Sequence, residues 1–343
     1  IAHHKVKTAI LVIAISLILY LPLALRVLVD GTERELMARA EATPLVIGSK
    51  GSSLDLVIDT LYFETKPLVS MTMSEAERVD QGGLALAIPV FTRFRAGGCA
   101  IVGTTLDYFG FRGLSVGRGR QIARLGDCVL GAELADELAL GPGDHLLSSP
   151  ENLFDLAGNY PLKMKVAGVL RRTHTPDDRA VLVDIRTAWI IAGLGHGHQD
   201  LSKVEDPDVL LKREGNTYTA NAKLLQYTEI TDQNIDSFHF HGDTSRFPVT
   251  AVIAVPPDRK AADLLRGRYQ SAGEPCQILR PIDVIRDLTA TIFRVEGLLN
   301  GVFGLLALAT MLLILLVVML SLRLRRQEVQ TMFKLGCSRS MIA

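Results

Sequence analysis

Two long runs of apolar residues without charge lie near the two ends of the chain. The first covers residues 8–25 and the second covers residues 297–322. A transmembrane helix needs about 20 apolar residues, because each residue rises about 1.5 Å through about 30 Å of hydrocarbon. The second run can span a bilayer with some tilt. The first can span it because Arg26 can extend its charge to the interface and residues 27–29 prolong the apolar stretch. The pattern predicts two transmembrane helices.

The first run has one alternative explanation. Basic residues at Lys5 and Lys7, followed by an apolar stretch, also form the pattern of a cleaved signal peptide. The run is long for such a peptide and no clean small-x-small cleavage site ends it, so we favour a membrane helix. A buried core helix is a poor explanation for the second run because of its length.

The segment between the two runs has mixed strand and helix patterns. Strands are expected at 44–47, 84–90, 100–103, 163–170, 180–183 and 249–255. One helix should be capped by Ser52 or Ser53, and another should cover residues 129–140. The first of these repeats apolar residues at helical spacing, which predicts a buried face of Leu54, Val57, Ile58 and Leu61. The expected fold is a membrane protein with a large α+β extracytoplasmic domain between its first and second helix.

A further helix is predicted to begin at Pro281 and to continue into the second apolar run without a breaker. Over residues 282–325 it would be about 65 Å long. Residues 30–41 could extend the first helix outward in the same way. The predicted organisation begins with a cytoplasmic start and the first membrane helix at 1–30. An extracytoplasmic domain follows at 31–280 and can divide into two subdomains. A stalk helix at 281–296, the second membrane helix at 297–322 and a cytoplasmic segment at 323–343 complete the chain.

Charge and composition restrict the function and set the orientation. Hydrophobic residues make up 48% of the chain, which excludes a mainly disordered protein. The 37 basic residues equal the 37 acidic ones, so nothing indicates a nucleic-acid partner. Basic residues flank the outer ends of both runs, which places both ends in the cytoplasm by the positive-inside rule. Acidic residues outnumber basic ones by six within residues 31–296, so the predicted exterior is acidic.

Motifs for catalysis are weak or absent. The chain has no G-x-x-x-x-G-K-[ST] sequence, so it carries no P-loop ATPase site. Ser115 lies in a G-x-S-x-G pattern, but Arg118, Gly119 and Arg120 follow where a nucleophile elbow needs a helix. We therefore assign no catalytic residue and no cofactor-binding residue.

Two H-x-H pairs occur in the exterior segment, His196 with His198 and His239 with His241. On a strand, residues two apart face the same side, so each pair could chelate Zn²⁺ or Cu²⁺ or respond to pH. The alternative is a solvated loop around His196 and an edge strand around His239. The sequence favours that alternative, and we assign no metal ligand from it.

The cysteines have no C-x-x-C spacing. Cys99, Cys128 and Cys276 are predicted outside the membrane, and Cys337 inside. Cys99 with Cys128 is the preferred candidate for a disulfide in an oxidising compartment. Free buried thiols are the interpretation we favour.

The predicted cytoplasmic segment carries an apolar stripe. Val329, Met332, Phe333 and Leu335 recur at helical spacing, and Gly336 should end the helix. A short amphipathic helix parallel to the membrane is one interpretation. A helix that docks in a groove of a partner is the other.

The same segment resembles the coupling segment of MacB/FtsX/LolC-type ABC transporter permeases, in the pattern R-x-x-E-V-x-x-M-x-x-L-G-C-S-R from Arg325 to Arg339. The exterior stretches 102–121, 129–146 and 164–189 are similar to the MacB-like periplasmic domain and occur in the same order. Residues 42–63 resemble a variant found in members with unassigned substrates. The family has four membrane helices, so we expect this sequence to be a partial chain.

The resemblance implies mechanotransmission. A separate ABC ATP-binding subunit would bind ATP and Mg²⁺, and the permease would be a homodimer in the bacterial inner membrane with its large domain in the periplasm. A periplasmic partner protein can also be involved, and the substrate is not identified. The ATPase would dock on Glu328, Val329, Met332, Phe333, Leu335, Gly336, Ser338 and Arg339.

Two other classes of protein remain as alternatives. A two-helix sensor with a periplasmic ligand-binding domain would have the same layout, but no signalling heptads or signalling domain follow Leu322. An anchored periplasmic hydrolase would rest only on Ser115. The sequence favours the permease over both alternatives.

Overall fold

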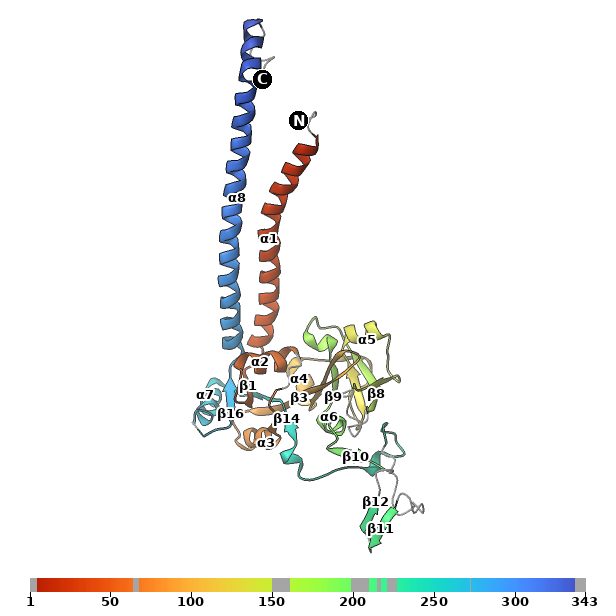
Figure 1. The fold of residues 1–343 in the computed structure, drawn as a ribbon. Helices are drawn as coiled ribbons and strands as arrows, with labels where there is room; N and C mark the ends of the chain where they lie inside the picture. Colours follow the sequence, from red (N-terminus) through yellow and green to blue (C-terminus); the bar gives the residue numbers. More distant parts are fainter. Residues whose placement is uncertain are drawn as a thin grey trace. The chain divides into compact units, whose positions relative to one another are not determined.

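The chain forms two compact units. The computed structural model describes residues 5–63, 68–149, 161–198, 210–214, 217–220, 227–271 and 273–336. One unit combines residues 1–37 with residues 286–343, and the other is the continuous segment 38–285. Figure 1 labels the helices and strands.

The first unit consists of most of two long apolar helices, whose ends next to the sheet belong to the second unit. Helix α1 runs over Lys5–Glu41 and α8 over Pro281–Lys334. Both are long and apolar enough to cross a membrane, and none of the residues in their most apolar stretches is buried within the protein. Exposed leucine and valine along these helices would be costly in water and favourable in lipid. The two long apolar helices that the sequence predicted, and the extension of the first to Glu41, are therefore confirmed.

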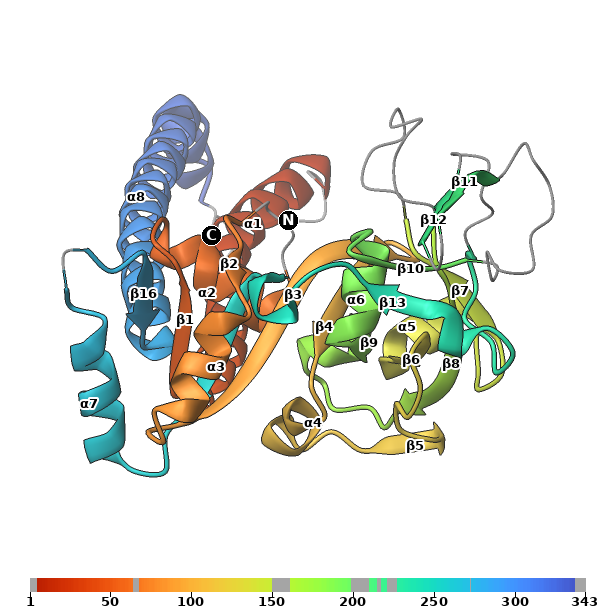
Figure 2. The same cartoon turned by 90° about the horizontal axis from the view of Figure 1, so that it is seen from below.

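The second unit is built on one mixed sheet, which has ten strands among the described residues. Its strand order is β16-β1-β15-β3-β4-β9-β6-β8-β5, and β7 pairs with β8. The strands of this sheet are β1 (Leu45–Ser49), β3 (Leu86–Ala96), β4 (Cys99–Thr104), β5 (Val116–Gly119), β6 (Asp127–Leu130), β7 (His145–Leu147), β8 (Lys163–Leu170), β9 (Val181–Asp184), β15 (Ala251–Val255) and β16 (Cys276–Leu279). The pairs β4–β9 and β6–β8 are parallel, and the other pairs are antiparallel. Figure 2 shows the long strand β3 crossing the unit between its two halves.

Helices cover the sheet, and shorter strands pair in separate ribbons outside it. The helices are α2 (Ser53–Tyr62), α3 (Ser74–Gln81), α4 (Asp107–Arg112), α5 (Ala132–Leu138), α6 (Ile185–Ile191) and α7 (Arg259–Arg268). The 3₁₀ turns are η2 (Pro176–Arg179), η4 (Ile235–Ser237) and η5 (Thr244–Arg246). Three two-stranded ribbons pair β10 (Gly195–Gly197) with β13 (Phe238–Phe240), β11 (Leu210–Glu214) with β12 (Thr217–Ala220), and β14 (Pro248–Val249) with β2 (Met71–Thr72).

Alternate residues of the central strands pack on opposite faces of the sheet. In β9, Val181 and Val183 belong to one buried cluster and Leu182 to the other. The first cluster includes Trp189 of α6, and the second includes Tyr108 of α4. Because successive side chains of a strand point to opposite sides, a strand buried on both faces reads as a continuous apolar run. Each predicted strand has a counterpart in the structure: β1, β3, β4, β8, β9 and the β14–β15 segment.

Two helix predictions need correction. Helix α2 is capped by Ser52, whose hydroxyl accepts a hydrogen bond from the backbone N–H of Asp55, as predicted. Its buried face is wrong in part, because Leu54 is exposed while Asp59 is buried and accepts a hydrogen bond from Thr92. The helix expected over residues 129–140 is shorter, because residues 129 and 130 belong to β6 and only Ala132–Leu138 is α5.

Candidate functional site

The predicted docking segment is the end of α8. The helix continues without a break to Lys334, and Gly336 has a left-handed backbone with φ of +89°, so the predicted end at Gly336 is confirmed. The alternative of a separate short helix along the membrane is wrong, because no helix starts after the membrane span within the described residues. The side chains of Met332 and Leu335 are exposed. Of the other predicted docking residues, Glu328, Val329 and Phe333 lie in the last two turns of α8, whereas Ser338 and Arg339 lie outside the described residues.

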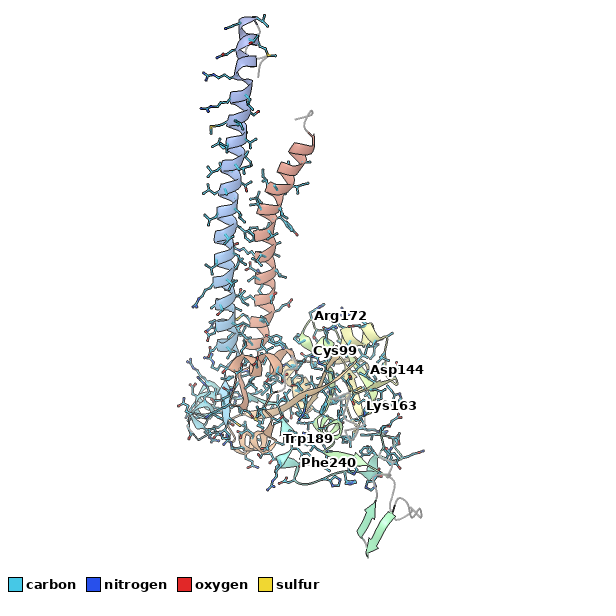
Figure 3. The ribbon with its side chains drawn as sticks, viewed as in Figure 1. Cys99, Asp144, Lys163, Arg172, Trp189 and Phe240 are labelled. Atoms are coloured by element: carbon cyan, nitrogen blue, oxygen red, sulfur yellow. The ribbon has the colours of Figure 1, made fainter. Side chains whose placement is uncertain are left out.

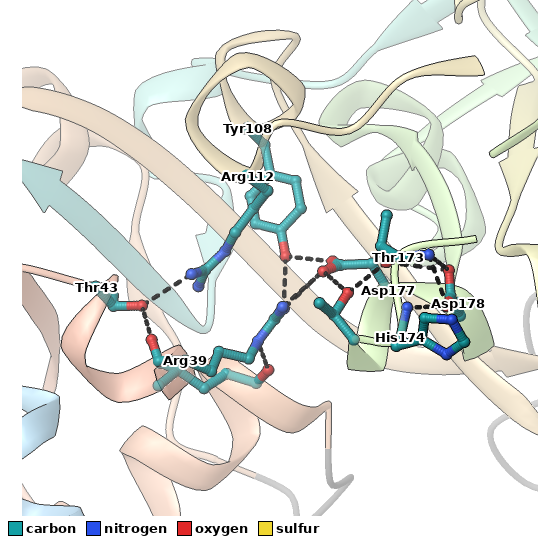
Figure 4. Close-up of polar contacts among 10 residues, drawn as sticks. Arg39, Thr43, Tyr108, Arg112, Thr173, His174, Asp177 and Asp178 are labelled. Atoms are coloured by element: carbon teal, nitrogen blue, oxygen red, sulfur yellow. Dashed lines mark hydrogen bonds and ion pairs between the residues drawn. The ribbon is translucent and has the colours of Figure 1, made fainter. Parts of the chain in front are cut away.

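The last turn of α1 carries a buried ionic anchor that the sequence interpretation missed. The guanidinium of Arg39 donates to both carboxylate oxygens of Asp177, with N···O distances of 2.6 and 3.2 Å (Figure 4). It also donates to the hydroxyl of Tyr108 at 3.1 Å and to the backbone carbonyl of Leu61. The Tyr108 hydroxyl in turn donates to Asp177 at 2.8 Å. Arg39, Tyr108 and Asp177 therefore form a closed polar network, which we call the α1 anchor.

The pKa values within the α1 anchor follow from burial and pairing. Burial alone would raise the pKa of Asp177, but the charge of Arg39 and the hydrogen bonds from Arg39 and Tyr108 lower it overall. Burial would lower the pKa of Arg39, and Tyr108 and Asp177 together raise it instead. Burial raises the pKa of Tyr108, with a further contribution from Asp177. Arg39 and Asp177 are thus an ion pair at neutral pH, with a neutral phenol beside them.

The turn that carries Asp177 is itself fixed by hydrogen bonds. The carboxylate of Asp178 accepts from the backbone N–H groups of Thr173 and His174 at 2.7–3.0 Å. Gly131 packs so closely against this turn that a Cβ atom there would lie 2.3 Å from the backbone of Asp177 and Asp178. The anchor is therefore held on a preorganised turn.

Next to the anchor, Arg112 is mostly buried. Its Nη1 donates to the Thr43 hydroxyl at 2.9 Å, and its guanidinium lies over the rings of Phe111 and Tyr108. Its Nε and Nη2 have no hydrogen-bond partner among the described residues. Burial lowers the pKa of Arg112. Thr43 accepts from Arg112 and donates to the carbonyl of Arg39, so the chain just after α1 is also fastened to α4.

A small pocket lies beside β6, and most of the charged side chains around it are paired. Arg120 donates to Asp127 at 2.6 and 3.0 Å, and Lys163 donates to Glu229 at 2.8 Å. His145 also contacts Glu229 at 3.1 Å. Because most of the charges around the pocket are neutralised in these pairs, we assign no ligand to it.

The structure gives no catalytic role to Ser115 and no disulfide among the described cysteines. Ser115 lies between helix α4 and strand β5, the reverse of the strand–Ser–helix order of a nucleophile elbow, so the structure gives it no catalytic context. Cys99, Cys128 and Cys276 are buried free thiols, and the Cys99–Cys128 disulfide is absent. Cys337 lies outside the described residues.

The four exterior histidines of the H-x-H pairs come together. The expected loop around His196 is instead strand β10, which pairs with the strand that holds His239. The Nε2 atoms of His196 and His241 are 3.4 Å apart. Partial burial, with the nearby imidazoles of His241, His239 and His198, lowers the pKa of His196.

The sequence of this chain matches one known protein family. The sequence profile of the MacB-like periplasmic core domain matches residues 8–224. No curated protein matches the chain significantly. The crystal structure of the periplasmic region of MacB from Actinobacillus actinomycetemcomitans matches with 12% sequence identity and a TM-score of 0.37, over 74% of this chain and 97% of that one. The extracellular domain of the noncanonic ABC-type transporter YknZ from Gram-positive bacteria matches with 12% identity and a TM-score of 0.37, over 68% of this chain and 98% of that one.

Proposed function

The chain belongs to the family of proteins with a MacB-like periplasmic core domain, and we propose that it is the permease subunit of an ABC transporter that works by mechanotransmission. In this proposal a separate subunit binds ATP and Mg²⁺ and docks at the cytoplasmic end of α8. Two copies of the permease form a dimer in the inner membrane, with the sheet domain in the periplasm. Movement of the helices drives export or extraction of a substrate.

The observation that carries the proposal is the continuity between each membrane helix and the sheet. Only Ala42, Thr43 and Pro44 separate α1 from β1, and only Arg280 separates β16 from α8. The strands β1 and β16 are antiparallel neighbours, with Val46 opposite Leu279. A displacement of either helix along its axis would therefore act directly on a hydrogen-bonded pair of strands. No long linker is present at either junction that could absorb the motion.

The α1 anchor supports the same proposal. Arg39 belongs to the last turn of the helix that carries the first membrane span, and its partner Asp177 is 138 residues away in the chain. A rigid helix transmits force to a domain only if the end of the helix is fixed to that domain. The bidentate pair fixes the end of α1 to the turn before β9.

Docking can be tested by co-purification of the full chain from its native membranes in mild detergent. Leu335 is 78% exposed, so Leu335→Asp should disturb an apolar contact with the partner and not the fold. Gln330→Asp is a matched control, because it adds the same charge at an exposed site about 140° away around the helix. We expect ATPase activity to co-purify with the wild type and Gln330→Asp, and to fall at least about tenfold for Leu335→Asp. Equal activity for both variants would refute the docking site, and a wild type without ATPase would favour the sensor alternative.

Motion can be tested by spin labels in the dimer. Arg294 is an exposed residue near the start of the second apolar run, so Arg294→Cys in a Cys337→Ser background gives one accessible label per chain. We expect a measurable distance between the two labels that shifts when ATP binds to the complex. The shift should disappear with Leu335→Asp. An unchanged distance in the complex would contradict mechanotransmission, and the absence of any distance would contradict the dimer.

A further inference from the structure

The ribbon formed by β10 and β13 gathers four imidazoles on one face. In this antiparallel pair His196 lies opposite His239. His198 and His241 are two residues further along the two segments and therefore point to the same side. The ring of His198 lies 5.1 Å from that of His239 and 5.7 Å from that of His196, centroid to centroid. Two short motifs that are far apart in the chain thus form one cluster.

The opposite face of the ribbon is fastened to the core. Gly195 pairs with Phe240 and Gly197 with Phe238. Each glycine lets the facing ring lie against the backbone, because a Cβ atom would come within 2.6 Å of that ring. Phe240 also packs edge-on against Trp189 at 6.4 Å between ring centroids, and both side chains are labelled in Figure 3. The histidine face is therefore carried on a packed support.

Three of the imidazoles are close enough to share one ion. The ring centroids of His196, His239 and His241 are 4.8–5.0 Å apart, and one nitrogen from each ring lies within 4.8 Å of the other two. The Nε2 atoms of His196 and His241 are 3.4 Å apart. Two nitrogens that bind one tetrahedral Zn²⁺ at about 2.0–2.1 Å are separated by about 3.3–3.4 Å.

The orientation of His239 is set by its second nitrogen. Nδ1 of His239 lies 3.0 Å from the backbone carbonyl oxygen of Ser237, which can only accept, so Nδ1 carries the proton. The lone pair of the neutral ring is then on Nε2. Metal-binding histidines are commonly held in this way by a carbonyl that accepts from the other ring nitrogen.

We propose that His196, His239 and His241 bind one divalent transition-metal ion, namely Zn²⁺, Cu²⁺ or Ni²⁺, with His198 or water as the fourth ligand. Imidazole nitrogen suits these late first-row ions, whereas Ca²⁺ and Mg²⁺ prefer oxygen ligands. The other group with ligand-like spacing among the described residues is Glu75, Glu274 and Cys276. Arg78 already pairs with both of its carboxylates, so the histidine cluster is the better site.

The bound ion can be measured by calorimetric titration of the detergent-solubilised full chain with Zn²⁺, Cu²⁺, Ni²⁺ and Mg²⁺. His3→Gln and His4→Gln are included in every protein, because these two residues could bind metal themselves. The test variant combines His196→Gln with His241→Gln. The control is His145→Gln, which removes one histidine from a pair with Glu229 elsewhere in the domain.

We expect the parent protein to bind one Zn²⁺, Cu²⁺ or Ni²⁺ ion per chain and to bind no Mg²⁺. The double variant should bind that ion at least about tenfold more weakly, and His145→Gln should bind it as the parent does. Thermal unfolding without metal checks that the double variant is folded. A Co²⁺-loaded parent should show the intense visible absorption of a low-coordinate site, which the double variant should lack. Unchanged affinity and absorption in a folded double variant, or a parent that binds none of the three ions, would overturn the site.

Discussion

Nη1 of Arg39 lies 2.6 Å from Oδ2 of Asp177, and the two side chains are only 7% and 1% exposed. Burying two charges costs several kcal/mol per ion, which their attraction offsets only when the remaining polar atoms are also satisfied. Tyr108 and the carbonyl of Leu61 supply those contacts. The intact pair therefore adds little net stability to the fold, although removal of one partner would leave an uncompensated buried charge. Its main role is to fix the position of the last turn of α1.

Removal of one member of the pair should be strongly destabilising. We expect Asp177→Ala to lower the free energy of unfolding of the sheet domain by about 3–5 kcal/mol, because Arg39 is left buried without its counter-charge. Trp189 is the only tryptophan and is buried in this domain, so its fluorescence reports domain unfolding in the full chain. The neighbouring Arg179→Gln is the control. Its ion pair with Glu137 is exposed to solvent on both sides, so its loss should change the free energy of unfolding far less than Asp177→Ala does.

The contribution of Asp177 should depend on pH in a defined direction. Burial works against the charged carboxylate, but Arg39 outweighs it, so the folded-state pKa lies below the ordinary value of 3.8. A group with a lowered folded pKa stabilises the fold above its unfolded pKa, and this stability is lost as the pH falls through the folded value. The difference in unfolding temperature between wild type and Asp177→Asn should therefore be constant from about pH 7 to pH 5 and shrink below about pH 4. A difference that grows on acidification would contradict the ion pair.

The elements that the sequence predicted well are those with a local signal. The strand expected over residues 163–170 is β8 with the same bounds, and the helix expected to run through the second apolar run is α8. Hydrophobic alternation and an unbroken helical pattern are properties of neighbouring residues. The two H-x-H pairs could also be recognised in the sequence, because each consists of residues only two positions apart.

The anchor and the histidine cluster depend on distant residues, which periodicity cannot reveal. Nothing near Arg39 in the chain indicates that it is buried, because Asp177 lies 138 positions away. The buried side of α2 was mispredicted because Asp59 finds a partner in Thr92 on β3. The register that brings His196 opposite His239 is likewise set by the fold and not by either motif.

Close packing at Gly131 should make that position intolerant of any side chain. A Cβ atom would lie 2.3 Å from backbone atoms that cannot move alone, so we expect Gly131→Ala to destabilise the domain by at least about 1–3 kcal/mol. Gly110→Ala is the matched control, since Gly110 lies in α4 and a Cβ atom there would meet nothing within 4 Å. The stability of the Gly110→Ala variant should equal that of the wild type or exceed it by up to about 1 kcal/mol, because alanine has a higher helix propensity than glycine. Similar unfolding temperatures for the two variants would show that the turn is not tightly packed.

The buried thiols should be unreactive in the folded protein. Burial raises the pKa of Cys128 to about 12 and that of Cys276 to about 11, and only the thiolate reacts with a disulfide reagent. In a Cys337→Ser variant we expect almost no labelling of the native chain at about pH 8. Denaturation without a reductant should make the thiols of Cys99, Cys128 and Cys276 react with the reagent together. Fewer than three reactive thiols after denaturation would indicate a disulfide.

Glycine at position 197 should matter for metal binding although it supplies no ligand. A Cβ atom there would lie 2.6 Å from the ring of Phe238, so Gly197→Ala must displace β10 from β13. His196 and His239 would then lose their register, and ligand geometry is what a metal ion requires. We expect Gly197→Ala to weaken binding of the transition metal about tenfold or more while the Trp189 unfolding transition remains cooperative. The control is Gly242→Ala, which follows His241 and has open space around it, although its φ of +99° adds backbone strain. A larger loss of affinity for Gly242→Ala than for Gly197→Ala would show that the pairing of the two strands does not position the ligands.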